Sequence, residues 1–471
     1  MVLDRSKKRS LTKYHGELAR CQTGSFMLRC HCVSLGCPKN RVDTERLLGT
    51  PGLEFSLVDD AARADFIFVN TCGFIRPAVE ESVETIAGLI ADLEPLCPKP
   101  RLVVAGCLIG RYGAAVLAEE LPEVDLWLDN RELSRWPALL AAFLGLPEPA
   151  PPVMLTGREA AARIPSLTRR FGAAPSYAWL KISDGCRHAC SFCTIPFIRG
   201  KHHSHSIPAL VAEARGLLEH GARELILAAQ DVTGWGHDLV PRRDLRHLLD
   251  ALLPLPGLDW LRLMYLYPTG LNRELLEYLR RAGPPFVPYF DVPFQHAHPD
   301  VLRRMGRPFA ADPRETVERI RGIFPEAALR TSLIVGFPGE SDEQFEILLD
   351  FVRSIRFTHL GVFAYEPEEG TPAAAMPGQV ADAVKQARKD AVMREQSAIS
   401  AAWLEQFRGQ RLSVLVDAPH PDWPGLYSGR AWFQAPEVDG IVYISGPGAA
   451  VGALVEADIV ETREYDLEAL A

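Results

Sequence analysis

The segment Asp184-Gly-Cys-Arg-His-Ala-Cys-Ser-Phe-Cys193 places three cysteines in one short loop with the spacing Cys-x3-Cys-x2-Cys. It follows Tyr177-Ala-Trp-Leu-Lys-Ile-Ser183, an apolar run typical of a buried strand. Three thiolates this close together can hold three corners of a four-iron four-sulfur cluster and leave the fourth iron open to another ligand. We therefore expect Cys186, Cys190 and Cys193 to bind one such cluster.

The cysteine loop follows the first of six predicted strands that alternate with helices. The strands are expected at Trp179–Ser183, Glu224–Ala229, Leu261–Leu266, Pro288–Pro293, Ala328–Val335 and His359–Ala364. The helices between them are expected at Ile207–His220, Leu245–Leu253, Arg273–Ala282, Arg314–Ile323 and Glu343–Ile355. Repeated βα units with polar residues at the strand ends predict a central partial (β/α) barrel, with the site at its C-terminal rim.

In residues 30–165, which precede the core, predicted strands also alternate with predicted helices. This alternation predicts an open parallel α/β domain. Its expected strands are Cys30–Leu35, Phe66–Asn70 and Leu102–Ala105, and its helices are Val42–Leu48, Ala78–Leu93 and Tyr112–Leu121. Cys37, Cys72 and Cys107 are spaced by 35 residues and again by 35, and each follows one of these strands. Because the carboxyl ends of parallel strands share one edge, we expect these cysteines to converge and hold a second cluster. The alternative is that they are small buried apolar residues.

Zinc is the alternative metal for either cysteine set. Structural zinc usually takes four protein ligands, and a residue such as His188 or His202 is a candidate for the fourth.

The C-terminal region changes pattern. A helix is expected within residues 379–408, after which short strands punctuated by Gly and Pro predict a small antiparallel β-barrel. These strands are Arg411–Val416, Gly429–Phe433, Gly440–Ile444 and Ala453–Val460. The chain therefore divides into a basic, disordered head at 1–29, an N-terminal domain at 30–165, a core at 166–408 and the barrel at 409–471. Residues from Leu146 start a Pro/Ala-rich linker, and Met27 is a second candidate for the first residue.

Composition limits the class of protein. The 471 residues carry a net charge of −9 and include ten cysteines, most of them in clusters. No apolar run is long enough for a membrane helix, and the head lacks the apolar segment of a secretory signal. Clustered cysteines without export favour metal chemistry in a reducing compartment, so we expect a cytoplasmic protein that does not contact membranes.

Residues 409–471 carry three arginines against ten acidic residues, among them Asp417, Glu437 and Asp439. Nucleic-acid modules need Lys and Arg to replace the counterions of phosphates. The acidic barrel therefore argues against tRNA as a partner and favours a basic protein; the alternative is a merely soluble acidic surface.

The motifs together resemble the RimO-type radical S-adenosylmethionine (SAM) methylthiotransferases of the MiaB/RimO family. The resemblance covers residues 30–468 and rests on Val33-Ser-Leu-Gly-Cys-Pro-Lys-Asn40, Asn70-Thr-Cys-Gly-Phe-Ile75, Ala105-Gly-Cys-Leu108, Lys181-Ile-Ser-Asp-Gly-Cys186, Ile195-Pro-Phe-Ile-Arg-Gly200, Asp291-Val-Pro-Phe-Gln-His296 and Ile334-Val-Gly-Phe-Pro-Gly-Glu340. Pro38-Lys39-Asn40 and Gln295-His296 resemble the protein-modifying group more than the tRNA-modifying one. His202-His-Ser-His205 departs from the family, where an Arg-containing stretch is more usual.

The resemblance implies a methylthiotransferase domain, a radical SAM core and a TRAM barrel, with two four-iron four-sulfur clusters and SAM as cofactors. It implies methylthiolation of the β-carbon of an aspartate in the twelfth protein of the small ribosomal subunit, with an electron donor such as a flavodoxin or ferredoxin. The alternatives are a tRNA methylthiotransferase of the MiaB type and a non-catalytic metal-binding scaffold.

No catalytic side chain is expected beyond the cluster ligands, but several residues at the barrel rim are candidates for SAM contacts. Phe192 could pack near adenine or belong to the core, and the others could instead be ordinary rim structure. The remaining candidates are Gln230, Asp231, Gln295, Arg330 and Gly336.

Overall fold

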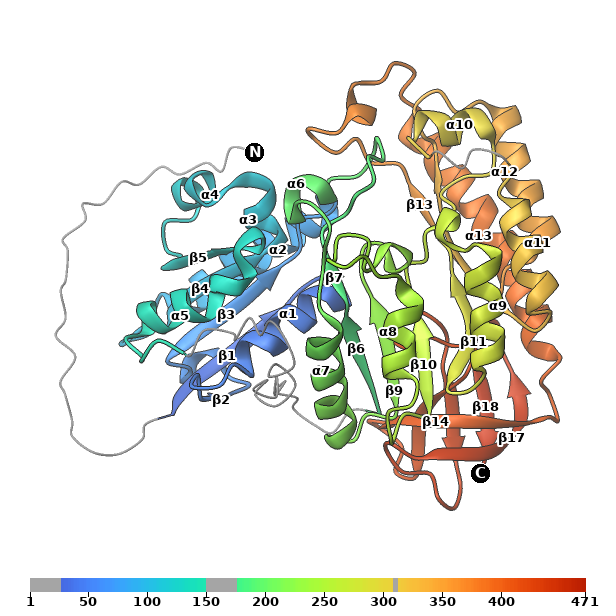
Figure 1. The fold of residues 1–471 in the computed structure, drawn as a ribbon. Coiled ribbons are helices and arrows are strands. Elements are labelled where there is room, and N and C mark those ends of the chain that lie inside the picture. The colour runs from blue at the N-terminus through green and yellow to red at the C-terminus, as the bar shows by residue number, and fades with distance from the viewer. Residues whose placement is uncertain (1–26, 150–175, 308–311) are drawn as a thin grey trace.

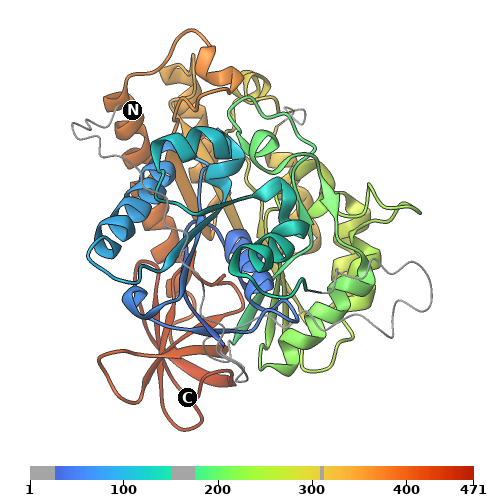
Figure 2. The same cartoon turned by 90° about the vertical axis from the view of Figure 1, so that its left-hand side faces the viewer.

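The computed structural model describes residues 27–149, 176–307 and 312–471, which form three domains (Figure 1). The expected disordered head at 1–29 and the expected linker fall almost wholly outside these residues. The N-terminal domain lies beside the core, and the C-terminal barrel lies beneath the core in the two views (Figure 2).

The N-terminal domain is a five-stranded parallel sheet in the order β2-β1-β3-β4-β5, as its pattern predicted. The strands are β1 (Leu28–Ser34), β2 (Phe55–Leu57), β3 (Phe66–Thr71), β4 (Arg101–Gly106) and β5 (Leu126–Asp129). The helices are α1 (Pro38–Leu48), α2 (Arg76–Leu93), α3 (Cys107–Tyr112), α4 (Ala114–Glu120) and α5 (Trp136–Leu144). The helix expected at Tyr112–Leu121 is present as α4, but it begins two residues later and Tyr112 ends the separate helix α3, because Gly113 adopts φ +82° between them.

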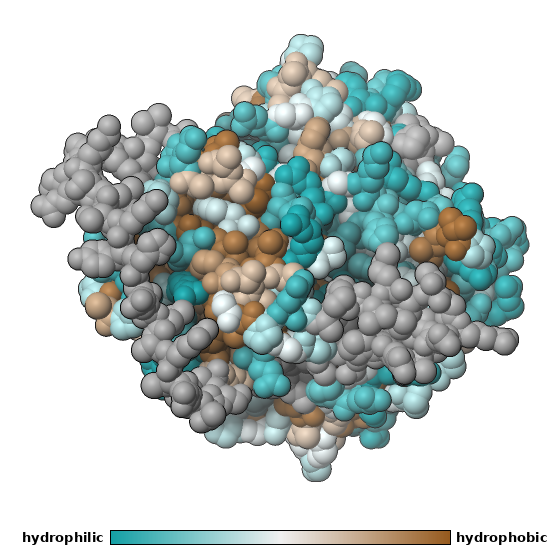
Figure 3. Space-filling model, turned by 60° about the vertical axis from the view of Figure 1, so that its left-hand side comes forward, coloured by the Kyte–Doolittle hydropathy of each residue, from teal (hydrophilic) through white to brown (hydrophobic). Residues whose placement is uncertain are grey.

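Three elements of this domain were not predicted, namely β2, β5 and α5. The two strands are only three and four residues long, so neither carries a clear alternation. Helix α5 (Trp-Pro-Ala-Leu-Leu-Ala-Ala-Phe-Leu) is apolar throughout, so it lacks the polar face that marks a surface helix. Figure 3 turns the N-terminal domain towards the viewer and shows apolar side chains gathered on part of its surface.

The core is a six-stranded open parallel sheet in the order β13-β12-β11-β10-β9-β6, which confirms the partial barrel. Its strands are β6 (Tyr177–Lys181), β9 (Glu224–Ala228), β10 (Trp260–Leu263), β11 (Phe286–Asp291), β12 (Ala328–Val335) and β13 (His359–Ala364), and β7 (Ser183–Asp184) pairs with β8 (His203–Ser204) beside them. The helices are α6 (Ile195–Arg199), α7 (Ile207–Glu219), α8 (Leu245–Leu252), α9 (Arg273–Ala282), α10 (Pro299–Arg304), α11 (Arg314–Ile323), α12 (Asp342–Ile355) and α13 (Asp382–Glu405). Within the described residues, no helix is long and apolar enough to cross a membrane.

The C-terminal barrel is closed by five strands in the order β14-β15-β16-β18-β17. They are β14 (Arg411–Pro419), β15 (Leu426–Ala431), β16 (Val442–Ser445), β17 (Leu454–Thr462) and β18 (Leu467–Leu470). Four of the pairings are antiparallel and β16–β18 is parallel. One parallel pair is unavoidable, because strands cannot alternate in direction around a closed ring with an odd number of members.

The core and the barrel share apolar packing. Successive strand residues point to opposite faces, so Leu180 of β6 packs with the helices while its neighbour Trp179 points the other way. Trp179 belongs to a buried cluster that continues into the barrel through Val414 and Phe433. The two domains are therefore joined by a common hydrophobic core.

Ion pairs reinforce this junction and correct one expectation about charge. Arg430 of the barrel is 1% exposed and its guanidinium contacts both Glu224 of the core and Asp417. Asp439 is ion-paired to Arg330 of the core, with 3.3 Å between the Asp439 Oδ1 and Arg330 Nε atoms. Asp417 and Asp439 are thus part of the junction, and the expectation that they belong to a free acidic surface is wrong.

Glu437 likewise accepts hydrogen bonds from Arg41 of the N-terminal domain (2.6 Å) and from the Tyr177 hydroxyl (2.7 Å). The net charge of a segment counts its carboxylates but cannot reveal that cations elsewhere in the chain already pair with them.

Candidate functional site

The three cysteines of the N-terminal domain lie at one edge of its sheet. Cys37 precedes α1, Cys72 follows β3, and Cys107 opens α3 directly after β4. At Gly36 a Cβ atom would lie only 2.7 Å from the Cys72 Cβ atom, so the Cys37 loop approaches Cys72 closely. Burial, and then the neighbouring charges of Cys107 and Cys37, raise the pKa of Cys72 to about 11. The structure thus brings together the three side chains that the spacing predicted.

Positively charged side chains lie close to two of these thiols, those of Cys37 and Cys107. Burial alone would raise the pKa of Cys37, but Lys39, Arg199 and backbone N–H donors outweigh it and lower the pKa. Burial raises the pKa of Cys107, and Arg199 opposes that effect. The Asn130 side-chain amide also donates to the Cys107 Sγ atom at 3.1 Å. Hydrogen-bond donors and cations around sulfur stabilise the thiolate, which is the form that binds metal.

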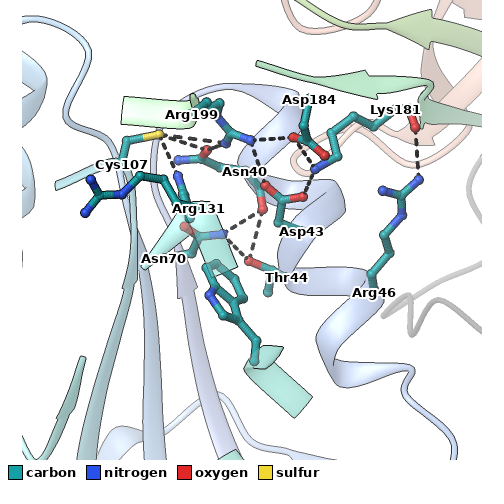
Figure 4. A network of polar contacts seen from close by, with 12 residues as sticks. Asn40, Asp43, Thr44, Arg46, Asn70, Cys107, Arg131, Lys181, Asp184 and Arg199 are labelled. Carbon is teal, nitrogen blue, oxygen red and sulfur yellow. Dashed lines mark hydrogen bonds and ion pairs between the residues drawn. The ribbon is translucent and has the colours of Figure 1, made fainter. Parts of the chain in front are cut away.

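A buried charge network ties this cysteine set to the core (Figure 4). Arg199, at the end of α6, places its Nη1 atom 3.1 Å from Asp43 Oδ2 on α1 and 3.0 Å from Asp184 Oδ1. The Lys181 ammonium on β6 contacts the same two carboxylates. Two cations therefore face two carboxylates at the domain boundary, and each charge is compensated where it is removed from water. Nearby, Arg199 also donates to the Asn40 side chain.

The second cysteine set lies on the loop between β7 and α6, at the C-terminal end of β6. The Ser191 backbone N–H donates to Met305 O at 3.0 Å, and the Ser191 hydroxyl donates to Arg304 O at 2.8 Å. Gly306 adopts φ +72°, and a Cβ there would lie 2.8 Å from Ala189 O, so glycine allows this close approach. The loop is thus clamped against the segment that follows α10.

Burial disfavours the thiolate form of two cysteines in this loop. Burial raises the pKa of Cys193 to about 12, against opposition from backbone hydrogen bonding. Burial likewise raises the pKa of Cys186. A metal centre must displace these protons, so its binding releases protons.

Two residues beside this loop were missed by the sequence reasoning, Tyr267 and Arg307. His188, between Cys186 and Cys190, stacks on the Tyr267 ring at 3.6 Å between centroids, and its Nε2 atom lies 2.7 Å from Asp231 Oδ2. The Arg307 guanidinium lies 4.7 Å from the centroid of the same Tyr267 ring, and its Nη1 atom donates to the Cys190 Sγ atom at 3.6 Å. Neither residue lies in a recognisable spacing, so only three-dimensional contact reveals it.

The predicted SAM contacts fall into two groups. Gln230, at the end of β9, has a buried side-chain amide whose nitrogen and oxygen have no partner within the described structure, so it is open to a ligand. Gln295 adopts φ +74° and is held by backbone bonds to Ser332 and Ile334. Gly336 adopts φ +71°, and a Cβ there would collide with the Lys385 side chain.

The other three candidates already have partners in the chain. Both Asp231 oxygens accept hydrogen bonds, from His188 on one side and from Thr233 and the Gly234 N–H on the other. Phe192 packs against a buried apolar cluster that includes Phe337. Arg330 is ion-paired to Asp291 and Asp439, which gives it a role in joining the core to the barrel.

The donor sets fit iron–sulfur clusters better than zinc. In residues 27–149, 176–307 and 312–471, no three His, Cys, Asp or Glu side chains are arranged to bind a single metal ion. The Nε2 atoms of His188 and His202 are engaged with Asp231 and with Ser204, respectively. In a four-iron cluster each thiolate binds a different iron, so the sulfurs need not meet at one point.

Comparison with known proteins covers all three domains. The model of the radical SAM superfamily matches residues 180–352, that of the uncharacterized protein family UPF0004 matches 29–129, and that of the TRAM domain matches 409–471. A protein of Nitratidesulfovibrio vulgaris named ribosomal protein uS12 methylthiotransferase RimO is 61% identical over 445 residues, which cover 94% of this chain and 100% of that protein. The protein of the same name from Lawsonia intracellularis is 56% identical over 447 residues, covering 94% and 98%.

Solved structures share the fold at low sequence identity. The radical S-adenosylmethionine methyltransferase TsrM from Kitasatospora setae superimposes with a TM-score of 0.54 at 17% identity, over 86% of this chain and 77% of that one. At this identity the likeness concerns the arrangement of the chain alone.

Proposed function

The chain belongs to the RimO family of radical SAM methylthiotransferases, and from that premise we propose that it transfers a methylthio group to the β-carbon of an aspartate in ribosomal protein uS12. The observation that carries the proposal is the 61% identity to a uS12 methylthiotransferase along that protein's whole length. We propose that the enzyme works in the cytoplasm, with a flavodoxin or ferredoxin as electron donor.

Family membership implies SAM and a four-iron four-sulfur cluster, for which Cys186, Cys190 and Cys193 are the proposed ligands. We propose that Cys37, Cys72 and Cys107 hold a second cluster. When bound, these groups supply the one-electron cleavage of SAM and the sulfur that is transferred. The protein contributes their placement and their surroundings.

The described side chains support particular roles around the SAM loop. His188, held by Asp231, fixes the loop against Tyr267, and Arg307 donates to Cys190. The unpartnered amide of Gln230 is suited to the amino or carboxylate group of SAM. Gln295 and Gly336 shape the rim beside it, while Phe192 lines the apolar side.

The charge of the barrel favours a protein substrate over tRNA. Of its three arginines, Arg430 is buried and ion-paired, and Arg463 pairs with Glu468. Phosphate recognition needs several free cations, which this surface lacks. Glu456, Asp458 and Glu461 of β17 are exposed and suit a basic partner such as a ribosomal protein.

Mass spectrometry of uS12 and of total tRNA from a deletion strain tests the proposal. Loss of the methylthio group from uS12, with tRNA methylthiolation unchanged, is expected. Reintroducing the wild-type gene should restore the modification, and a Cys193→Ala gene should not. A deletion strain with fully modified uS12 would refute the proposed function.

A further inference from the structure

Lys39, two residues after Cys37, carries a buried positive charge without a carboxylate partner in the described chain. Lys39 is 7% exposed, and its Nζ atom lies 3.6 Å from the centroid of the Tyr265 ring in the core. Other buried cations such as Lys181 and Arg430 are paired with carboxylates. A buried ammonium is costly unless it is paired, and the Tyr265 side chain, to which Lys39 also hydrogen-bonds, and the nearby Cys37 thiol offset part of that cost without supplying a carboxylate.

Lys39 connects the segments that carry the two cysteine sets, through its contact with Tyr265. Tyr265, which it contacts, accepts a hydrogen bond through its carbonyl oxygen from the Val232 N–H at 3.2 Å. Val232 follows Asp231, the carboxylate that holds His188 on the SAM-binding cysteine loop. Two residues beyond Tyr265, the Tyr267 ring stacks on that same His188. Lys39 therefore extends from the Cys37 loop to the strand ends that support the other cysteine loop.

In the proposed reaction the substrate carbon receives sulfur at the Cys37, Cys72 and Cys107 set and loses hydrogen at the Cys186, Cys190 and Cys193 set. That carbon must therefore lie between the two cysteine sets. If the substrate is an aspartate, as the proposed function holds, its β-carbon is bonded directly to a carboxylate carbon. That carboxylate must enter a site shielded from water, where it needs a positive partner. Gln230, whose amide is unpartnered, lies at the neighbouring strand end and offers a donor but no charge.

We propose that the Lys39 ammonium binds the side-chain carboxylate of the target aspartate. This inference rests on the proposed function and adds the residue that selects an acidic side chain. The Tyr265 ring holds the ammonium until the substrate arrives. Charge-assisted hydrogen bonds in a site removed from water are strong enough to discriminate between aspartate and its neutral isostere, asparagine.

The test measures binding by the anaerobically reconstituted enzyme, with two ligands of nearly equal shape. These are purified uS12 and the uS12 variant in which the target aspartate is replaced by asparagine. A hydrogen bond to a charged group predicts that the wild-type enzyme binds the aspartate form about 10- to 100-fold more tightly. Lys39→Met should abolish this ratio mainly by weakening binding of the aspartate form, whereas Lys39→Arg should retain part of it.

Lys99→Met, the same change at an exposed lysine, is the matched control and should keep the wild-type ratio. Circular dichroism establishes that each variant is folded, and iron content establishes that it carries its clusters. A ratio near one in the wild-type enzyme, which requires no variant, would overturn the inference, as would a full ratio in Lys39→Met. Wild-type enzyme that binds neither form and leaves uS12 unmodified would refute the proposed function itself.

Discussion

Arg199 and Cys107 belong to different domains, yet the Nη2 atom of Arg199 lies 3.7 Å from the Cys107 Sγ atom. The same guanidinium contacts Asp43 on the N-terminal domain and Asp184 on the core. One side chain thus joins the segment that follows the loop of Cys186, Cys190 and Cys193 to the cysteine set of the other domain. The positions of the two sets are therefore mechanically linked.

Arg199→Gln should destabilise the protein strongly, because it leaves the buried carboxylate of Asp43 with Lys181 as its remaining ion-pair partner and removes one partner of Asp184. Breaking a buried ion pair typically costs about 3–5 kcal/mol. Chemical unfolding followed by tryptophan fluorescence measures the change in unfolding free energy. Arg273→Gln, which removes one member of an exposed pair with Glu277, is the control and should cost at most about 1 kcal/mol. Equal effects of the two changes would contradict the role of Arg199.

Replacing Cys186, Cys190 and Cys193 by alanine should abolish reductive SAM cleavage. Iron content after anaerobic reconstitution should fall from about eight to about four per chain, because one of two clusters is lost. Iron analysis and 5′-deoxyadenosine assays measure the two effects. Continued formation of 5′-deoxyadenosine would show that the loop has been assigned wrongly.

Replacing Cys37, Cys72 and Cys107 by alanine should have the converse effect. Methylthio transfer should stop while reductive SAM cleavage continues, since these cysteines lie on a separate sheet. Thermal unfolding must accompany the assay, because cluster binding is coupled to folding. A folded variant that no longer cleaves SAM would argue against separate roles for the two sets.

Reversing Glu456, Asp458 and Glu461 to lysine should weaken uS12 binding, most clearly at low salt. Exposed charges are screened over about 8 Å at physiological ionic strength, so the difference from wild type should shrink as salt is added. The same triple reversal at exposed Glu81, Glu84 and Asp92 of α2 is the matched control. Stronger uS12 binding by the β17 variant would show that the acidic surface of β17 is not the binding site for uS12.

Reversal of Asp439 should behave differently, because this carboxylate is 1% exposed and paired with Arg330. It should lower the unfolding temperature first, so it belongs to tests of stability rather than of substrate charge.

His205 should make the stability of the metal-free protein fall at acid pH. Burial first, and then the charge of Arg46, lower its pKa from 6.5 against the opposing effect of Asp184. Below about pH 6.5 the unfolded chain binds a proton at this residue that the folded chain does not. The contribution of His205 to the free energy of unfolding is therefore complete above about pH 6.5 and is lost as the pH falls through the pKa of His205 in the folded protein.

His205→Gln should reduce the loss of unfolding free energy between pH 7.5 and pH 5.5. His203→Gln, at an exposed position of the same segment, serves as the control. An identical pH dependence in wild type and His205→Gln would contradict the assignment.

Local patterns of the sequence determined where many helices and strands lie and where one cysteine set is placed. Strand β12 and helices α9 and α11 begin and end where their periodicity placed them, because each buries one regular face against the same core. The position of Cys37, Cys72 and Cys107 at one sheet edge also followed from sequence, since each cysteine comes directly after a strand and parallel strands end together.

Only the tertiary structure decided which charges meet. The composition of the barrel predicts that Asp417 and Asp439 lie on a free acidic surface, but Arg430 of the neighbouring strand pairs with Asp417, and Arg330, distant in sequence, pairs with Asp439. Lys39 and Arg199 likewise have no periodic pattern, because their roles depend on contacts between domains, and Arg307 depends on contacts between separate segments of the core. A repeat along the chain specifies which face of an element is buried, but the partner of a single buried charge is set by how whole domains pack.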